Sequence, residues 1–420
     1  MIELDEAEIA RLARCVPLGG LAPGDVVAVR AGNTPFFVAA RDAAAARGLI
    51  VLPLSLKLTA PEVAHALRVS GARRVLEEGS LGPPGPAPPP RAIGATVLLT
   101  SGTTGAPKAC LRPAAAEEAR AAELVASHGI SADDVHLVAC PLTHSAPGIL
   151  LRAARAQGAR TVLLEKFSPE AFLAAVSATR ATLFFLVPTQ VERLLPHLGS
   201  LPWVRRCIVA GAPFPAASKR RLAERLPFVE FYGASETGTI SVAAAQPSPD
   251  GWVGRPPPGV TVELRDPDPT GLGEVFVCSP AVMARYLDGE PSADGFVSVG
   301  DLARCDASGA ITLVDRKHDT IITGGVNVYP AEVEAAIAAH PDVAGVVVCG
   351  LPDPDWGEMV AAVVAFRGTP RPLDAYLRER LAPAKIPKRW RVVGLEDLPI
   401  GGSGKLLRRA ARALFSGERS

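Results

Sequence analysis

The feature that most constrains the fold is an alternation of short apolar segments with longer helix-forming segments, from about residue 24 to residue 232. Segments such as Ile50–Leu54 and Thr182–Val187 are short and apolar, which predicts buried strands. Pro61–Ser70 is a typical helix-forming segment, and Thr59 is placed to cap it. Strands that alternate with helices at this spacing predict an α/β fold with parallel sheets.

The strands expected from this alternation cover residues 24–29, 50–54, 95–99, 135–140, 161–164, 182–187, 206–210 and 228–232. The expected helices cover residues 35–47, 61–70, 117–125, 149–157 and 169–177. Residues 79–90 are dominated by Pro and Gly and are expected to form a loop without regular structure. Ligands of open α/β sheets bind beyond the carboxyl ends of the strands, so a site is expected where these strands end in small or polar turns.

The pattern changes from about Val253 onward. Short strands separated by Gly, Pro and Asp are expected at residues 260–265, 274–278, 296–299 and 311–314, which predicts a small β-rich subdomain. A separate unit is expected beyond Arg316. Its helices are expected at residues 330–339 and 373–381, its strands at 343–349 and 360–366, and a basic tail follows.

Composition excludes several classes of function. The chain has 420 residues, of which 48% are hydrophobic and 21% charged, as in an ordinary globular protein with two or three domains. A net charge of +1 gives no overall field for nucleic acid or membrane, and no apolar run approaches the roughly 20 residues of a membrane span. The seven cysteines are scattered and the start, Met1–Glu6, is acidic, so a cytoplasmic protein without disulfides or a zinc site is expected.

Residues 100–108, Thr-Ser-Gly-Thr-Thr-Gly-Ala-Pro-Lys, form the most distinctive motif. Glycines let backbone N–H groups face an anion, hydroxyls add donors, and Lys108 brings a positive charge, so a phosphate-binding turn is favoured over a plain surface turn. The common P-loop requires Gly-Lys after four intervening residues, but Pro107 stands five residues after Gly102. Residues 402–405 do not form a P-loop either, because Leu406 stands where that motif requires the hydroxyl of a Ser or Thr. A kinase or a switch GTPase is therefore disfavoured.

Four stretches together resemble the motifs of the adenylate-forming superfamily, which includes acyl-CoA synthetases, non-ribosomal adenylation domains and beetle luciferases. They are residues 100–108, residues 232–237, the run from Gly300-Asp301-Leu302 through Arg316 to Pro330, and residues 402–405. Their order and separation match across roughly residues 20 to 410. The resemblance implies a large N-terminal domain, residues 1–316, with two βα sheets and a β-rich subdomain. A small, mobile α+β C-terminal domain, residues 317–420, is implied to follow.

The family's chemistry has two half-reactions. A carboxylate attacks the α-phosphate of ATP to give an acyl-adenylate and pyrophosphate, and a thiol then displaces AMP to form a thioester. Two anions must meet, so the site needs cations and aimed donors. By resemblance, the residues that bind ATP are Thr100, Ser101, Gly102, Thr103, Thr104, Gly105, Lys108, Gly211, Ala212, Pro213, Tyr232, Gly233, Ser235, Asp301 and Arg316.

The resemblance also implies individual roles. Glu236 would be the Mg²⁺ ligand, which suits an ion that keeps its waters and shares substrate oxygens; a solvated acid is the plain alternative. Tyr232 would stack on adenine, with residues 211–213 lining the other side. Asp301 would accept both ribose hydroxyls, and Arg316 would contact ribose or phosphate.

In the C-terminal domain, Lys405 would be the catalytic lysine that contacts the carboxylate and the α-phosphate during adenylation. Without the resemblance, it would be interpreted as an exposed lysine in a basic tail. His318 would be the hinge about which the domain swings between the half-reactions. Gly324 and Gly325 would then line the thiol channel, where adjacent glycines allow close backbone approach.

The substrate class follows from residues 141–148, which contain no acid, and none appears before Glu165. An unpaired buried ammonium is costly, so α-amino acids are disfavoured. Pro-Leu-Thr-His at 141–144 and Val-Pro-Thr at 187–189 resemble acyl- and aryl-CoA ligases, and His144 would border the carboxylate or be a structural histidine.

The sequence therefore predicts an ATP- and Mg²⁺-dependent ligase that joins a small non-amino carboxylic acid to coenzyme A. Three alternatives stay open: a ligase that loads a carrier-protein phosphopantetheine, a luciferase-like oxygenase, and an inactive nucleotide-binding relative. No nucleic-acid partner and no membrane insertion are expected, and the oligomeric state stays open.

Overall fold

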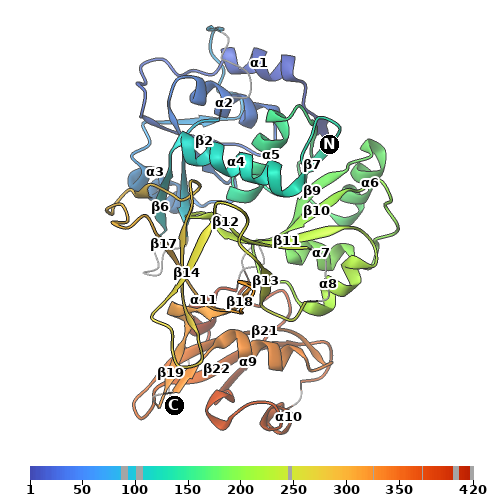
Figure 1. Ribbon diagram of the computed structural model, residues 1–420, viewed down its shortest axis with the longest axis vertical. Coiled ribbons are helices and arrows are strands. Elements are labelled where there is room, and N and C mark those ends of the chain that lie inside the picture. The colour runs from blue at the N-terminus through green and yellow to red at the C-terminus, as the bar shows by residue number, and fades with distance from the viewer. Residues whose placement is uncertain are drawn as a thin grey trace. The chain divides into compact units, whose positions relative to one another are not determined.

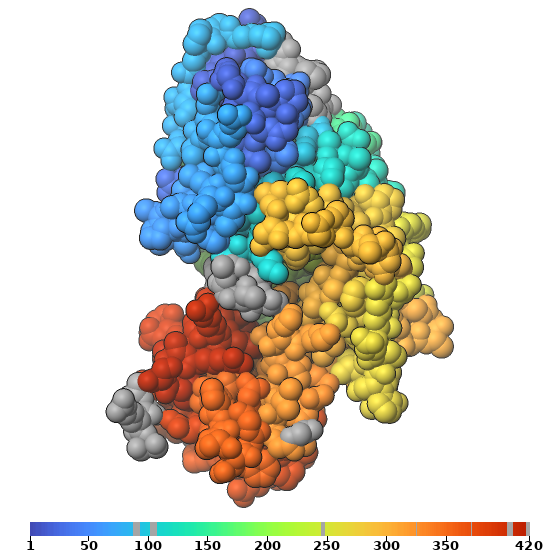
Figure 2. All heavy atoms as spheres, turned by 90° about the vertical axis from the view of Figure 1, so that its left-hand side faces the viewer, coloured from blue at the N-terminus to red at the C-terminus, as the bar shows by residue number. Residues whose placement is uncertain are grey.

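The computed structural model describes residues 1–86, 93–100, 107–244, 248–324, 326–370, 372–400 and 406–416 (Figure 1). The chain divides into two compact units. Unit 1 comprises residues 1–262 and 276–299, and unit 2 comprises residues 263–275 and 300–420. In the space-filling view, the segments of unit 2 are mainly orange to red (Figure 2). The domain boundary at residue 316 that the resemblance implies stays a prediction.

One sheet of unit 1 has the strand order β16-β6-β5-β3-β2-β4 within the described residues. The neighbours β4, β2, β3 and β5 are parallel, as predicted, whereas β6 and β16 are antiparallel additions at one edge. The bounds are β2 Val26–Arg30, β3 Ile50–Leu54, β4 Arg74–Glu77, β5 Thr96–Thr100, β6 Lys108–Arg112 and β16 Arg285–Tyr286.

The other sheet of unit 1 has the order β1-β8-β7-β9-β10-β11-β12 within the described residues. Its strands from β8 to β11 are parallel, which confirms the predicted parallel sheet, and β1 and β12 are antiparallel edges. The bounds are β1 Ile2–Glu3, β7 Val135–Val138, β8 Arg160–Leu163, β9 Leu183–Leu186, β10 Arg206–Val209, β11 Phe228–Ala234 and β12 Gly238–Ala244.

Helices cover both faces of the second sheet (Figure 1). Residues of α6, α7 and α8 pack on one face, where the rings of Phe172 and Phe184 meet edge to face 5.1 Å apart. Residues of α4 and α5 pack on the other face, and α1 and α2 join the core of the first sheet. The bounds are α1 Glu6–Arg14, α2 Pro35–Ala46, α3 Ala60–Ser70, α4 Ala114–His128, α5 Ser145–Ala156, α6 Pro169–Thr179, α7 Pro188–Leu194 and α8 Ala216–Ala223.

Local sequence accounts for the helix ends that were predicted. The Thr34 hydroxyl accepts a hydrogen bond from the Phe37 N–H at 3.4 Å, and Pro35 begins α2. At the start of α3, the Glu62 carboxylate accepts the Thr59 N–H at 2.7 Å, as in a capping box. The helix ends at Gly71, whose φ of 65° is left-handed.

The described strands of the β-rich region are β13 Trp252–Gly254, β14 Thr261–Arg265, β15 Gly273–Cys278, β17 Val297–Cys305 and β18 Ile311–Arg316. In unit 2, residues Asp301–Cys305 of β17 pair antiparallel with β18, Ile311–Arg316. The short 3-10 helix η1, Lys317–Asp319, follows directly. The predicted strands of this region are confirmed, with β17 longer than expected.

The rest of unit 2 is a mainly antiparallel sheet with helices on both faces. The strand order is β20-β19-β22-β21 within the described residues, and β23 lies parallel beside β22. Helices α9 and α10 pack on one face, and α11 packs on the other. The bounds are β19 Ile321–Thr323, β20 Val326–Val328, α9 Pro330–Ala338, β21 Val343–Asp353, β22 Gly357–Phe366, α10 Asp374–Arg378, η2 Pro383–Lys385, β23 Arg389–Val392 and α11 Arg408–Ala413.

The α+β character predicted for this part is confirmed. The helix expected at 373–381 is shorter than predicted, and part of the basic tail forms α11. Among the described residues of the whole chain, no helix combines the length and the apolar composition needed to cross a membrane.

Candidate functional site

The predicted phosphate turn connects two antiparallel strands. Thr100 ends β5 and pairs in register with Lys108, which begins β6. The sequence predicted a helix at residues 117–125 and missed β6; the helix, α4, covers Ala114–His128. Thr100 and Lys108 therefore lie opposite each other at the mouth of the turn. The other predicted phosphate-binding residues, Ser101, Gly102, Thr103, Thr104 and Gly105, lie outside the described residues.

The segment around Glu236 forms a second hairpin. Strand β11 runs past Tyr232 to Ala234, further than predicted, and the turn of residues 235–237 leads into β12, which the sequence did not predict. Gly233 lies where this ladder shifts register. A Cβ at Gly233 would lie 2.3 Å from the Gly238 carbonyl oxygen, so only glycine fits there. The turn thus presents Ser235 and Glu236 at a tightly fixed position.

Glu236 is held by a segment that sequence analysis did not single out. The Tyr286 hydroxyl donates a hydrogen bond to Glu236 Oε1 at 2.9 Å, and the Met283 N–H donates to the Glu236 carbonyl at 2.6 Å. The ammonium of Lys108 lies 5.2 Å from the centroid of the Tyr286 ring. The structure therefore brings Lys108 and Glu236 to one place, as the phosphate and metal roles require, through Tyr286. No local pattern in the sequence marks this tyrosine.

The surroundings of Tyr286 keep its hydroxyl protonated, so that it can donate a hydrogen bond. Burial, the negative charge of Glu236 and the hydrogen bond to that carboxylate raise the pKa of the phenol well above its ordinary value, and a hydrogen bond with Thr100 lowers it in part. The phenol is therefore protonated across the physiological range and can donate to Glu236.

The predicted adenine-binding residues follow neighbouring strands. Residues 211–213 come after β10, and Tyr232 lies near the end of β11. Because β10 and β11 are parallel and in register, with Val209 opposite Glu230, their carboxyl ends meet at the same edge of the sheet. Gly211 has a φ of 93°, which favours glycine at this turn. The positions of these residues agree with a common site, but their contact with a nucleotide stays a prediction.

His144 directly precedes α5, which begins four residues earlier than predicted, and its side chain makes no capping hydrogen bond to the helix. Partial desolvation and the positive charge of Lys57 lower the pKa of His144, so its neutral form is favoured near neutral pH. The Arg112 guanidinium, at the end of β6, donates to the hydroxyl of the next residue, Ser145, at 2.5 Å. Strand β6, which carries Lys108, is therefore linked through Arg112 to the start of the helix that follows His144.

In unit 2, Asp301 and Arg316 are direct cross-strand partners. Arg316 Nε lies 3.1 Å from Asp301 Oδ1, and the Asp301 side chain is buried while Arg316 is partly exposed. His318 lies in η1, and a Cβ at Gly300 would lie 3.5 Å from its ring. The two motif residues, on consecutive antiparallel strands, thus form one ion pair beside the predicted hinge.

Of the two glycines predicted to line the thiol channel, only Gly324 lies among the described residues. Gly324 has a φ of 57°, and its N–H donates to the Trp356 carbonyl at 2.9 Å. A Cβ at Gly324 would lie 2.5 Å from the Trp356 ring, so the close approach requires glycine. Gly325 and Lys405 lie outside the described residues. Their roles stay predictions.

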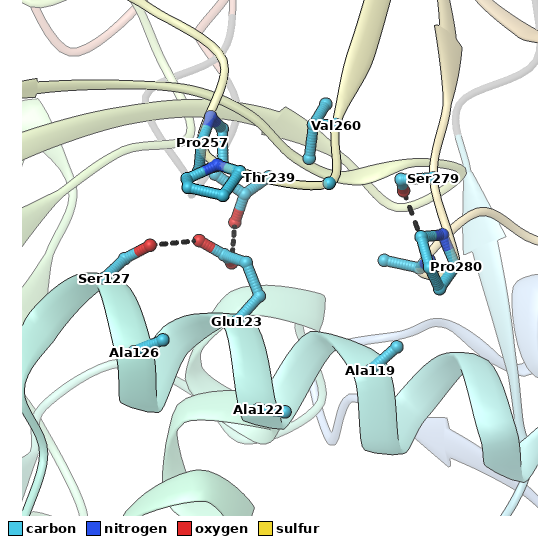
Figure 3. Close-up of a pocket in the computed structure, with 13 residues that line it drawn as sticks. Ala119, Ala122, Glu123, Ala126, Ser127, Thr239, Pro257, Val260, Ser279 and Pro280 are labelled. Atoms are coloured by element: carbon cyan, nitrogen blue, oxygen red, sulfur yellow. Dashed lines mark hydrogen bonds between the residues drawn. The ribbon is translucent and has the colours of Figure 1, made fainter.

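A separate cavity of about 390 Å³ lies in unit 1 between α4 and the loops around Pro257 and Pro280 (Figure 3). None of the predicted site residues line it. The Glu123 carboxylate at its wall accepts hydrogen bonds from the Ser127 hydroxyl at 2.7 Å and the Thr239 hydroxyl at 2.6 Å (Figure 3). Its polar group is therefore satisfied by the protein itself, and the cavity shows no group that demands a ligand.

The surroundings of Glu236 determine how many protein ligands a metal ion could have there. Across the described part of the chain, no three His, Cys, Asp or Glu side chains come together as a closed metal centre would require. Tyr286 bonds one oxygen of Glu236, and no hydrogen bond to the other oxygen is present among the described residues. One hard carboxylate oxygen fits Mg²⁺, which completes its shell with water and substrate oxygens.

Comparison with known proteins gives a consistent result. The AMP-binding enzyme family matches residues 4–84 and 78–287, and the AMP-binding enzyme C-terminal domain matches residues 332–405. Feruloyl-CoA synthase of Amycolatopsis sp is 33% identical over 97% of this chain and 92% of that protein.

Two further relatives have different acceptors or bound ligands. A fatty acid–[acyl-carrier-protein] ligase of Streptomyces coeruleorubidus is 32% identical over 98% of this chain and 91% of that protein. The structure of o-succinylbenzoate coenzyme A synthetase from Bacillus subtilis, in complex with ATP and a magnesium ion, superposes with a TM-score of 0.87. It is 28% identical and covers 96% of this chain and 92% of that one.

Proposed function

Because the chain belongs to the AMP-binding enzyme family, we propose that it activates a carboxylic acid without an α-amino group and joins it to coenzyme A. ATP supplies the adenylate, pyrophosphate leaves, and the thiol of coenzyme A then displaces AMP. The observation that carries this proposal is the convergence of Lys108 and Glu236 on Tyr286, at the mouth of the phosphate turn. A cation for phosphate oxygens and a carboxylate for a metal ion both contact one tyrosine there.

Each residue contributes a distinct part of the adenylation step. Thr100 and Lys108, with the turn between them, hold the outer phosphates of ATP. Glu236 would hold Mg²⁺ through its remaining carboxylate oxygen, and the bound ion would neutralise charge on the phosphates. Tyr232 and residues 211–213 hold adenine. These groups fix the nucleotide so that its α-phosphate faces the incoming carboxylate.

Residues of unit 2 have further roles in the proposed reaction. Asp301, oriented by its ion pair with Arg316, accepts the ribose hydroxyls. Lys405 places its ammonium where negative charge grows on the α-phosphate oxygen and the carboxylate. His144, largely neutral near pH 7, borders the carboxylate without forming a competing ion pair with it. In the thioester step, the segment of Gly324 and Gly325 replaces the Lys405 loop and admits the thiol.

The identity of the acid and the acceptor is open to direct assay. Full-length protein is incubated with ATP, Mg²⁺ and a panel of aryl, aliphatic and dicarboxylic acids, and each reaction is offered coenzyme A, a phosphopantetheinylated carrier protein, or oxygen alone. We expect mass spectrometry to detect an acyl-CoA for at least one acid. A product found only on the carrier protein would instead support the carrier-loading alternative. Light or oxygen uptake would support an oxygenase, and no product at all an inactive nucleotide-binding relative.

His318→Pro is expected to slow thioester formation by roughly tenfold or more while adenylation stays within about threefold of wild type. Proline fixes φ and removes the N–H, so the backbone of η1 loses the freedom that a hinge needs. Stopped-flow or quench assays of each half-reaction, the second one started from supplied acyl-adenylate, measure this split. His318→Ala keeps that freedom and serves as the control. A normal second step in the proline variant would place the hinge elsewhere.

A further inference from the structure

Tyr286 occupies a place that the proposed function leaves unexplained. Strand β16 pairs antiparallel with β6, so that Tyr286 lies opposite Cys110 and diagonal to Lys108 on the same face. From there the tyrosine reaches two charged groups at once. Its ring lies under the Lys108 ammonium at 5.2 Å, and its hydroxyl donates to Glu236 Oε1 at 2.9 Å.

The backbone of the same segment also holds Glu236 in place. The Met283 N–H donates to the Glu236 carbonyl at 2.6 Å, and the Cys110 thiol lies 3.7 Å from the Ser235 carbonyl oxygen. Glu236 is therefore fixed through both its main chain and its side chain. A turn residue of a hairpin would otherwise be free to rotate its carboxylate among several rotamers.

The arrangement also keeps two opposite charges apart. Although Lys108 and Glu236 both contact Tyr286, no ion pair joins them among the described residues. A lysine and a glutamate that paired directly would neutralise each other, and neither would be available to a nucleotide. The aromatic face holds the ammonium by a cation–π interaction, and the hydroxyl occupies one carboxylate oxygen.

We propose that Tyr286 is a positioning residue that separates Lys108 from Glu236 and aims each of them at the metal–nucleotide complex. The inference rests on the proposed function, since it assigns the two charges to phosphate and metal. Its hydroxyl serves the metal ligand, and its ring serves the lysine. The two parts of one side chain therefore make separable contributions.

Tyr286→Phe tests the hydroxyl, because it keeps the ring beneath Lys108. We expect the full-length variant to bind Mn²⁺·ATP about tenfold more weakly than wild type, as expected for loss of a hydrogen bond to a charged group. Binding of ATP in EDTA is expected to be unchanged. The signal of free Mn²⁺ in electron paramagnetic resonance measures the first affinity, and titration calorimetry measures the second.

Tyr286→Leu tests the ring. We expect it to weaken binding of ATP in EDTA as well, because Lys108 loses its aromatic partner and pairs with Glu236. The matched control is Tyr376→Phe in α10, where the ring also carries a cation, Arg380, at 3.7 Å. The control is expected to bind both forms of ATP as wild type does.

Three results would overturn the inference. The first is a Tyr286→Phe protein that binds Mn²⁺·ATP as tightly as wild type does. The second is a variant that loses the same affinity for ATP with and without metal, and the third is a variant whose melting temperature is well below that of wild type. The second and third results would assign the tyrosine a merely structural role. Wild-type protein that binds no Mn²⁺·ATP would overturn the proposed function itself. The two failures are therefore distinguishable.

Discussion

Lys405→Ala is expected to slow acyl-adenylate formation by a hundredfold to a thousandfold, the usual cost of removing one donor that stabilises transition-state charge. Formation of the thioester from a supplied acyl-adenylate is expected to stay within about threefold of wild type. The difference follows from the proposed role of Lys405, whose ammonium meets the α-phosphate only during the first half-reaction. Rapid-quench measurement of each half-reaction separates the two effects.

The control for this variant is Lys388→Ala, which removes an exposed lysine from the same unit. It is expected to leave both half-reactions unchanged. Equal loss of both half-reactions in the Lys405 variant would contradict the proposed exchange of the lysine loop for the thiol-channel segment. An unchanged adenylation rate would remove Lys405 from the catalytic residues altogether.

Glu117→Gln is expected to lower the free energy of unfolding by about 3–5 kcal/mol, because it leaves buried guanidinium groups without their counter-charge. Glu117, in α4, is fully buried and lies 2.5 Å from Arg112 Nε. It also pairs with Arg152, while Arg41 and Arg120 add positive charge nearby. Urea unfolding followed by circular dichroism measures the loss. The neighbouring exposed Glu118→Gln is the matched control, with an expected change below about 0.5 kcal/mol.

This ion cluster also predicts a pH dependence. Burial alone would raise the pKa of Glu117, but the surrounding arginines outweigh it and lower the pKa from 4.5 to about 2. The folded-state pKa is depressed, so the contribution of Glu117 to stability is present above pH 4.5 and is lost as the pH falls toward 2. The difference in unfolding free energy between wild type and Glu117→Gln is therefore expected to narrow over this range. A difference that stays constant with pH would contradict the ionised state assigned to Glu117.

The buried arginines could not be predicted from the sequence. Hydrophobic periodicity assigns charged residues to the surface, yet Arg112 and Arg152 lie in the interior because Glu117 compensates their charge. The partners come from β6, α4 and α5, which are brought together only by the tertiary fold. No spacing in the chain announces such a cluster.

The parts of the fold that were predicted have local signals. Helices α2 and α3 begin at capping residues followed closely by proline, and the parallel strands form apolar runs. Strand β6, Lys-Ala-Cys-Leu-Arg, has charged ends and was missed, because its identity as a strand depends on pairing with β5. Strand β12 was missed for a similar reason, since it is the returning arm of the Glu236 hairpin.

The candidate site shows the same division. Asp301 and Arg316 were each predicted from their motifs as nucleotide-binding residues, and the structure adds an ion pair between them that the motifs did not predict. Tyr286 could not be predicted, because it reaches Lys108 and Glu236 through strand pairing across the first sheet rather than through a local pattern. Motifs identify residues that touch the ligand, whereas residues that position them depend on packing.

Acid-dependent exchange of labelled pyrophosphate into ATP tests the central claim most directly, because it requires a reversible attack of the carboxylate on the α-phosphate. With the wild-type protein, Mg²⁺ and at least one carboxylic acid of the panel that has no α-amino group, label is predicted to enter ATP. When the acid is omitted, no label is predicted to enter ATP. Folded protein that binds ATP but exchanges no label with any acid offered would contradict the account.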